Sequence, residues 1–523
     1  MTSLPAPKGT GYAFCVMIAD IVPITRIRRN TSTWSYQVPR GSSCIPGQLV
    51  RVQVHGRSCL GVIWAVREKD EKATALIEEI ITTWPLLTGQ HRELIEWRAT
   101  YGLCSLSTSL FTWLPAALRG PSLTSTTKRQ LAEFSELPGA SQQALVLPVE
   151  RPDIASELRA RSFQAVVELF GQKETEELTN WLSIRSGKTT IIIGRERALC
   201  APFLRLQSIQ LREPEHISYH LEQSPRVSIV EATQVLAKQH GATLTLRSYL
   251  PHEAALALWP EASGVTDISQ PAQVQQLRDT AITPELITGC QQALQNNQRA
   301  FLVINAHDRV ITVQEGGQNL AKPLAGAATL AKQLAKALGQ PSLPISITLG
   351  TRSVLQQSLD NTGFSSVLAL DPVLQASTSA NHLHGIADLG RLLATGAPLL
   401  VQARTLRHPL VLALAAGKLE AYTLAYIHEL KESHLPPFSQ QIALVLPQEE
   451  EHLIDVTLTK LQSLTIDAWQ VGGPDEISIK GKPHIALWLH HDQPDARIPA
   501  QLRTLLIALP KPWQVWRNPW FLL

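Results

Sequence analysis

The chain has 523 residues, of which 44% are hydrophobic and 17% charged, a composition typical of a soluble globular protein. Its length predicts three or four domains. No apolar run is long enough to span a membrane and the N-terminus lacks an apolar signal core, so we expect a cytoplasmic protein. The net charge is only +3, which excludes binding of polyanions through overall charge. Residues 1–119 are more basic, with 13 Lys/Arg against 8 Asp/Glu.

The cysteines give no sign of a metal or disulfide framework. No two of them form a C-x-x-C pair, which excludes a sequence-local zinc ribbon and argues against a disulfide scaffold. We expect buried or inert thiols, with no metal and no cofactor. The six positions are Cys15, Cys44, Cys59, Cys104, Cys200 and Cys290.

Residues 1–119 are predicted to form a small β-barrel or sheet followed by a helical tail. The strand-like runs are separated by turns at Gly41, Gly47 and Gly56. These runs are Trp34–Val38, Leu49–Val54 and Leu60–Val66. Leu94, Trp97 and Tyr101 have the spacing of a helix face. Residues 120–142, rich in Ser, Thr and Gly, are expected to be a linker.

Residues 143–259 and 260–432 both alternate short apolar runs with amphipathic segments, which predicts two parallel α/β lobes. In the first lobe the expected strands are Ala144–Leu147, Ala165–Leu169, Thr190–Gly194 and Thr243–Leu246. In the second they are Phe301–Asn305, Ile345–Leu349, Val367–Leu370 and Leu399–Gln402. Ile229, Ala232 and Leu236 predict a helix that Gly241 ends. Two such lobes in tandem are typical of a RecA-type motor.

Residues 433–523 are predicted to form a ferredoxin-like α+β domain. The expected order is strand 441–446, helix 450–464, strands 467–471 and 484–489, helix 498–508 and strand 513–517. This is the β-α-β-β-α-β pattern.

The stretch Arg185–Thr190 contains Gly-Lys-Thr but does not fit a phosphate-binding loop. In the pattern G-x-x-x-x-G-K-S/T with Gly187 as the second glycine, the first glycine position holds Leu182. A phosphate loop also runs from strand to helix, whereas here a helix-like segment precedes Gly187 and a strand-like run follows it. We therefore expect Lys188 to be a solvated turn residue.

In order and spacing, the chain resembles the family of primosomal protein N-prime, the replication-restart helicase PriA, in a degenerate form. The resemblance covers most of the length. In the N-terminal block it rests on Trp34-Ser35-Tyr36-Gln37-Val38-Pro39, Gly47–Val54, Gly61-Val62-Ile63, Pro85-Leu86-Leu87 and Trp113–Arg119. Further along it rests on Arg185-Ser186-Gly187, Ile193-Gly194, Arg197–Phe203, Leu435–Ser439 and Gly473-Pro474. It implies an N-terminal domain like the 3′-DNA-end-binding domain of the family and two degenerate RecA-like lobes.

The departures from the family pattern include its ATPase motifs, and they carry the functional argument. The Asp-Glu-Glu-His box corresponds to Arg212–Glu215, and its metal-binding Asp becomes Arg212. The Gly-Ser-Ala-Thr-Pro box corresponds to Arg247–Pro251, and the arginine finger to Ala394 in the stretch Gly390–Ala394. The Lys-Gly expected after Gly350-Thr351-Arg352, the phosphate loop, the winged-helix insertion and the cysteine-rich zinc insert have no counterparts. We therefore predict that the chain is not an enzyme.

The resemblance leaves a DNA-binding function for the N-terminal block. In the family this block holds the 3′ end of a nascent leading strand in a pocket made by an aromatic-acidic pair and a glycine. The corresponding positions are Trp34, Ser35 and Gly56, with the pocket lysine replaced near Ala75. Trp34 offers a stacking face, and Ser35 only a hydroxyl. Basic residues expected to contact phosphates are Arg51, Arg57, Arg26, Arg28 and Arg29. The alternative is that Trp34 is part of the core and the arginines are a solvated face.

Three other clusters are expected to be structural. His490-His491-Asp492 and His382-x-His384 resemble fragments of metal sites, but such fragments without further ligands are usually surface residues. Trp513, Trp516 and Trp520 are expected in a core or an interdomain face rather than in a nucleic-acid platform.

Three functions remain open. The favoured one is a non-catalytic replication-restart protein, expected to be a monomer, that binds forked or single-stranded DNA and primosome proteins and promotes helicase loading. The second is a 3′–5′ DNA helicase with residual ATP-dependent activity, and the third is a protein-only scaffold.

Overall fold

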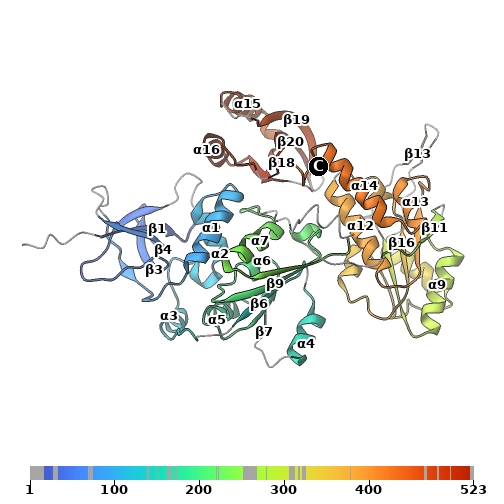
Figure 1. Cartoon of the computed structure of the whole chain (residues 1–523), viewed down its shortest axis with the longest axis horizontal. Helices are drawn as coiled ribbons and strands as arrows, with labels where there is room; N and C mark the ends of the chain where they lie inside the picture. The colour runs from blue at the N-terminus through green and yellow to red at the C-terminus, as the bar shows by residue number, and fades with distance from the viewer. Residues whose placement is uncertain are drawn as a thin grey trace, which may run out of the picture.

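The structure, a computed structural model, describes residues 17–518 except 27–32, 69–74, 138–140, 149, 162–165, 171–172, 220, 222, 251–267, 278–279, 305–312, 316–317, 321–325, 377–378, 465–467, 480–481 and 495. The chain is an elongated α/β protein with several sheets (Figure 1). A strand-only barrel lies at one end, two lobes with parallel sheets follow, and the C-terminal domain lies above them in this view. None of the helices within the described part is long and apolar enough to cross a membrane.

The N-terminal strands form one antiparallel sheet in the order β2-β1-β4-β3-β5. Their bounds are β1 (Met17–Pro23), β2 (Trp34–Gln37), β3 (Leu49–Val54), β4 (Arg57–Glu68) and β5 (Glu79–Ile80). The segment before β5 closes the sheet, because Gln37 N donates to Ala75 O at 2.8 Å and Ile77 N donates to Gln37 O at 3.2 Å. The predicted β-module is therefore a closed barrel, and β1 is a strand that the sequence analysis did not identify.

The barrel is followed by a helical tail. It consists of α1 (Gly89–Tyr101), α2 (Leu106–Trp113), the 3-10 turn η1 (Ala116–Leu118) and α3 (Ser125–Ala132). The expectation of a linker over 120–142 is wrong, because α3 lies there and Leu131 is buried. Trp84 stacks on Phe134 with ring centroids 3.8 Å apart, and its Nε1 donates to Leu131 O at 3.3 Å.

The first lobe is a parallel sheet in the order β10-β9-β6-β8-β7. Its strands are β6 (Gln142–Val146), β7 (Val166–Glu168), β8 (Ile191–Gly194), β9 (Leu206–Arg212) and β10 (Thr243–Arg247). Its helices are α4 (Pro152–Arg161), α5 (Glu174–Arg185), α6 (Glu196–Leu199), η2 (Ile217–Tyr219) and α7 (Ile229–His240). The predicted helix is α7. Ser228 caps its start by accepting from Glu231 N, and Gly241 ends it with a φ of 61°.

One hydrophobic core joins the barrel, the helical tail and the first lobe. It contains Val22 and Leu49 of the barrel, Leu94 and Trp113 of the tail, and Phe203 of the lobe. These three parts therefore form one packed body.

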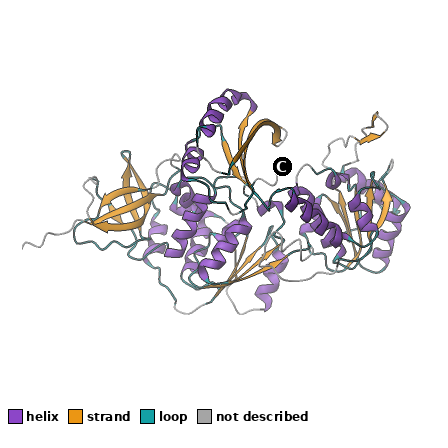
Figure 2. Cartoon of the chain, turned by 45° about the horizontal axis from the view of Figure 1, so that its top comes forward, coloured by secondary structure: helices purple, strands orange, loops and turns teal. Residues whose placement is uncertain are grey.

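The second lobe is also a parallel sheet, in the order β11-β17-β16-β12-β15, and a short hairpin follows β12 in the chain. Its strands are β11 (Gln273–Gln276), β12 (Arg299–Ile304), β15 (Ile347–Gly350), β16 (Thr362–Leu368) and β17 (Leu399–Ala403), with hairpin strands β13 (Val313–Glu315) and β14 (Gln318–Leu320). Its helices are α9 (Pro284–Gln295), α10 (Ala327–Ala337), η3 (Arg352–Gln356), α11 (Asp371–Leu374), α12 (Ser379–Leu393), α13 (Pro409–Ala415) and α14 (Leu419–Glu432). Figure 2 shows helices packed around the sheets of both lobes.

The C-terminal domain has the predicted β-α-β-β-α-β order. Its elements are β18 (Gln440–Pro447), η4 (Gln448–Leu453), α15 (Ile454–Gln462), β19 (Gln470–Ile479), β20 (Lys482–His491), α16 (Ala500–Ala508) and β21 (Gln514–Arg517). The sheet is antiparallel, in the order β19-β20-β18-β21. The domain contacts the helical tail, where Arg503 Nη2 donates to Thr100 Oγ1 at 3.1 Å and the Arg517 guanidinium lies over the Tyr101 ring.

Candidate nucleic-acid interface

Trp34 and Ser35 lie on β2, but they belong to opposite faces of that strand. Successive side chains of a strand alternate between faces. The barrel also has a small core of its own, which includes Val50 and Ile63. Trp34 is half-buried and, like Tyr36, belongs to this core. Ser35 points the other way, towards the outer surface of β1 and β4. The indole thus contributes to the core and keeps a partly accessible face.

Ser35 belongs to a polar network that the sequence analysis missed. Its Oγ donates to Asp20 Oδ1 at 2.7 Å, and Asp20 is its partner across β1 and β2. Arg67, on β4, holds the same carboxylate through Nε at 2.9 Å and Nη2 at 3.1 Å, and its Nη2 lies 3.0 Å from Ser35 Oγ. A carboxylate therefore lies beside position 35, although it comes from the neighbouring strand. The only sequence signal for it is an acidic residue within the apolar run Met17–Pro23.

Gly56 lies in the two-residue turn between β3 and β4, where His55 and Gly56 have φ values of 49° and 73°. Turns with two positive φ values match the twist of a hairpin and favour Gly. A Cβ at position 56 would contact nothing within 4 Å, so the tip of the hairpin is open. The Tyr36 hydroxyl donates to Gln53 O at 2.7 Å and so ties β2 to this hairpin.

The arginines predicted to contact phosphates differ in their surroundings. Arg57, beside Gly56, is exposed. Arg51 is largely buried. Its Nε donates to Glu79 Oε2 at 3.0 Å and its Nη1 donates to Pro121 O at 2.9 Å. Arg26 is exposed, and its guanidinium lies 5.2 Å from the Phe111 ring centroid. Arg28 and Arg29 lie outside the described residues. Ala75 lies next to β2 and carries no charge.

The segments Arg212–Glu215 and Gly390–Ala394 contact each other between the lobes. Arg391 Nη1 lies 3.0 Å from Glu213 Oε1, and 6% and 16% of these two side chains are exposed. The Arg391 guanidinium also lies 5.4 Å from the Tyr249 ring centroid. Beside this pair, the His216 and His384 ring centroids are 4.9 Å apart.

Burial shifts the pKa values of this interlobe cluster. It raises the pKa of Glu215 to about 7, although Ser248 Oγ donates to Glu215 Oε2 at 2.9 Å. It lowers the pKa of His216 to about 4, an effect that the nearby arginines reinforce. Burial also raises the pKa of Asp388, while its ion pair with Arg352 acts against that shift. Burial therefore favours the uncharged forms of both His216 and Glu215.

The histidine fragments are more buried than the sequence analysis expected. His382 and His384 are each 6% exposed, so their placement on the surface is wrong. The two ring nitrogens of His382 bond Val373 O and the Tyr422 hydroxyl, both at 2.9 Å. His490 Nε2 lies 3.0 Å from Asp492 Oδ1. No group of three or more His, Cys, Asp or Glu within the described residues is arranged to hold a metal ion.

The remaining predictions concern Lys188 and the C-terminal tryptophans. Lys188 is exposed in the turn between α5 and β8, as predicted. Trp513 and Trp516 are buried, and the Arg226 guanidinium of the first lobe lies 4.3 Å from the Trp516 ring centroid, so the core and interdomain expectation is confirmed for them. Trp520 lies outside the described residues.

Comparison with known proteins identifies the barrel and the helical tail. Residues 21–115 match the family of the PriA 3′-DNA-binding domain (3′BD). A structure of the Mycobacterium smegmatis helicase Lhr bound to ssDNA and AMP-PNP shares 12% identity, with a TM-score of 0.32 over 66% of this chain and 50% of that one. That likeness is too weak to support a conclusion, and the chain spans about half the length of that helicase. Over its N-terminal part, this chain is therefore PriA-like.

Proposed function

We propose that this chain is a non-catalytic replication-restart protein. It recognises stalled or abandoned DNA forks through its N-terminal barrel and promotes primosome assembly and helicase loading. The observation that carries the proposal is the match of residues 21–115 to the PriA 3′-DNA-binding domain family. Its partners are forked or single-stranded DNA and the proteins of the primosome, and it acts as a monomer.

Asp20 supplies the carboxylate that the resemblance leads one to expect at position 35. Its Oδ1 accepts a hydrogen bond from Ser35 Oγ at 2.7 Å, so the acidic group lies one side chain away from that position. Arg67 pairs with this carboxylate, and the ion pair favours its charged form. A terminal 3′-hydroxyl or a base edge can donate a hydrogen bond to such a carboxylate, while the accessible part of Trp34 stacks on the base.

The interlobe contact supports a role without ATP hydrolysis. Phosphoryl transfer by a motor needs a metal-binding carboxylate and an arginine finger that face the nucleotide from the two lobes. Here Arg212 and Ala394 stand at those two positions, and Glu213 and Arg391 from the same two segments form an ion pair at 3.0 Å. In this arrangement the pair holds the lobes together directly.

Binding to two forked DNAs at one moderate salt concentration tests the proposal, with fluorescence anisotropy as the readout. One fork carries a leading-strand 3′-OH at the junction, and in the other that end is blocked. We expect tighter binding to the fork with the free 3′ end. Asp20→Asn should reduce the ratio of the two affinities about tenfold, because a charge-assisted hydrogen bond is lost. Trp34→Ala should weaken it as well.

The matched control is Glu79→Gln, since Glu79 is also a barrel carboxylate in an ion pair with an arginine. It should leave the preference for the free end unchanged. Equal, salt-sensitive binding to both forks would reduce the interaction to phosphate attraction. Absence of binding would favour the protein scaffold, and DNA-stimulated ATP hydrolysis with unwinding would favour the residual helicase.

A further inference from the structure

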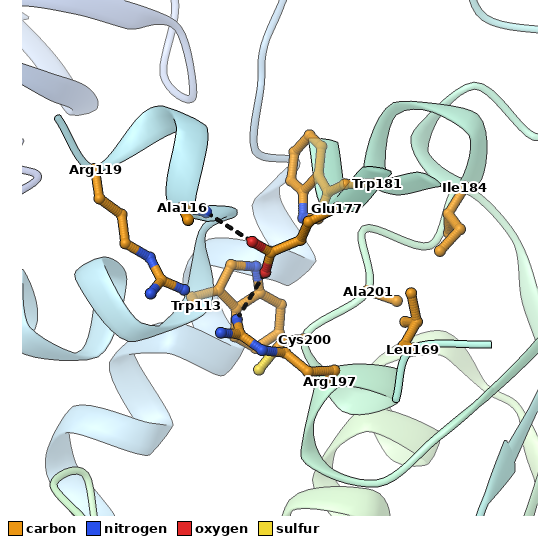
Figure 3. A pocket seen from close by; sticks show the side chains of 10 residues that line it. All are labelled: Trp113, Ala116, Arg119, Leu169, Glu177, Trp181, Ile184, Arg197, Cys200 and Ala201. Carbon is orange, nitrogen blue, oxygen red and sulfur yellow. Dashed lines mark hydrogen bonds and ion pairs between the residues drawn. The ribbon is translucent and has the colours of Figure 1, made fainter. Parts of the chain in front are cut away.

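A cavity of about 350 Å³ lies between the helical tail and the first lobe. The tail contributes Trp113 and Arg119, whereas α5 contributes Glu177 and Trp181. Figure 3 shows that these side chains gather on one side, and that Leu169, Ile184 and Ala201 form an apolar wall on the other. The cavity involves none of the barrel residues assigned above to DNA binding, so the inference is independent of the proposed function.

The polar side of the cavity carries excess positive charge. Glu177 Oε2 accepts from Ala116 N at 2.8 Å, and its Oε1 lies 3.4 Å from Arg197 Nη1. Arg119 lies near the same carboxylate, and its Nε and Nη2 donate to Leu114 O, which leaves its Nη1 for a ligand. Burial lowers the pKa of Arg119, and the nearby Arg197 lowers it further, whereas Glu177 acts against the shift. A bound anion would offset both the burial and the repulsion between the arginines.

Two hydrogen-bond donors at the cavity have no protein acceptor. Trp113 and Trp181 are 1% and 6% exposed, and within the described chain the Nε1 of each is buried without a partner. Buried polar groups in folded proteins are nearly always paired, but both indole nitrogens are covered by protein atoms, so a ligand in the cavity would have to displace those atoms before it could accept from them. Arg197 is 40% exposed and gives the polar side access to solvent.

We propose that this cavity binds a ligand that carries an anionic group on a planar ring system, of the size of a nucleoside monophosphate. Arg119 and Arg197 hold the phosphate. The ring lies between Trp181 and the apolar wall of Leu169 and Ile184. The volume is at the lower end of the range for small-molecule sites, which suits one nucleotide and not a dinucleotide.

Two sources offer this chemistry, a free nucleotide and the 5′-phosphorylated end of a DNA strand. Isothermal titration of the full chain with AMP, with adenosine and with inorganic phosphate tests the shared chemistry. A short oligonucleotide with and without a 5′-phosphate then tests the second source. We expect AMP to bind more tightly than either of its parts. Saturable binding of the phosphorylated oligonucleotide alone would assign the site to DNA ends.

Two variants separate the cavity from other binding sites. Arg197→Ala should weaken AMP binding about tenfold or more, because an arginine–phosphate contact is lost. Arg159→Ala is the control, since Arg159 is an exposed arginine in the same lobe that pairs with Glu168. Leu169→Trp should fill the apolar end and abolish binding, with circular dichroism confirming the fold. The proposal fails if neither AMP nor the 5′-phosphorylated oligonucleotide binds, if phosphate alone binds as tightly, or if Arg197→Ala and Leu169→Trp leave the affinity of the bound ligand unchanged.

Discussion

Glu213 and Arg391 form an ion pair of 3.0 Å between the two lobes, and each side chain is largely removed from solvent. Glu213 follows β9 of the first lobe, and Arg391 lies near the end of α12 of the second. Arg391 Nη2 also lies 3.4 Å from Gln357 O, within its own lobe. The pair therefore links the C-terminal end of β9 in one lobe to helix α12 of the other.

Removing one member of this pair should destabilise the protein more than removing both. Arg391→Leu leaves a buried carboxylate without a partner, which costs about 3 kcal/mol, and adding Glu213→Gln should restore part of that loss. Urea unfolding followed by circular dichroism measures both. The exposed pair Arg159–Glu168 is the control, and Arg159→Ala should cost less than about 1 kcal/mol. Similar losses for Arg391→Leu and Arg159→Ala would contradict a structural role for the interlobe pair.

Glu215 should make the stability depend on pH. Burial raises its pKa to about 7 from an ordinary value of 4.5, so between these values the folded chain holds a proton that the unfolded chain has lost. Its contribution to stability is therefore full below about pH 4.5 and falls as the pH rises through about 7.

Glu215→Gln cannot ionise and isolates this effect. The stability of the variant relative to the native chain should increase by on the order of 2–3 kcal/mol between about pH 5 and about pH 8. His216, whose pKa is lowered to about 4, acts in the opposite direction, but it is present in both proteins and cancels in the difference. A stability difference that is constant with pH would show that the carboxyl group is ionised in the folded state throughout this range.

Arg57 and Arg51 should respond differently to substitution because only Arg57 is exposed at the hairpin tip. Arg57→Ala should weaken binding to both forks alike and reduce the slope of log affinity against log salt by about 1. Arg51→Ala breaks the contacts with Glu79 and Pro121, so it should lower the thermal stability of the barrel. A salt slope that Arg57→Ala leaves unchanged would remove Arg57 from the DNA interface.

Gly390→Ala should destabilise the chain even though Gly390 lies in α12. Within an exposed helix this substitution would add up to ~1 kcal/mol of stability. Here a Cβ would lie 2.3 Å from Tyr249 O, a backbone atom of the other lobe that cannot move aside like a side chain. We therefore expect a lower unfolding temperature and a larger radius of gyration in small-angle scattering. An increase in stability would mean that the lobes separate freely at this point.

Local sequence patterns predicted the elements that have strong periodicity and clear ends. Helix α7 is an example, since its buried face, its Ser228 cap and its Gly241 terminus are all visible in the sequence. The patterns missed β1 and β9, which contain polar residues, Asp20 in β1 and Gln210 in β9, among their apolar ones. They also missed α3, because its Ser- and Thr-rich start resembles a linker but serves as a helix cap.

The candidate site was harder to predict because its contacts join distant parts of the chain. Trp34, Ser35 and Gly56 came from a resemblance, but the carboxylate beside Ser35 belongs to a residue 15 positions away and its arginine partner lies 47 positions from that carboxylate. The pairing of Glu213 with Arg391 likewise depends on how two lobes pack. Only the three-dimensional arrangement brings such residues together.

The core shared by the barrel, the tail and the first lobe determines how the protein can be divided. It runs from Val22 to Ala237 without interruption at Arg119, where the sequence suggested a domain boundary. A fragment that ends there would expose Trp113, Leu114 and the inner side of α1 to water. A fragment that keeps this core whole therefore extends through β10, and within it the barrel packs against the tail and the first lobe.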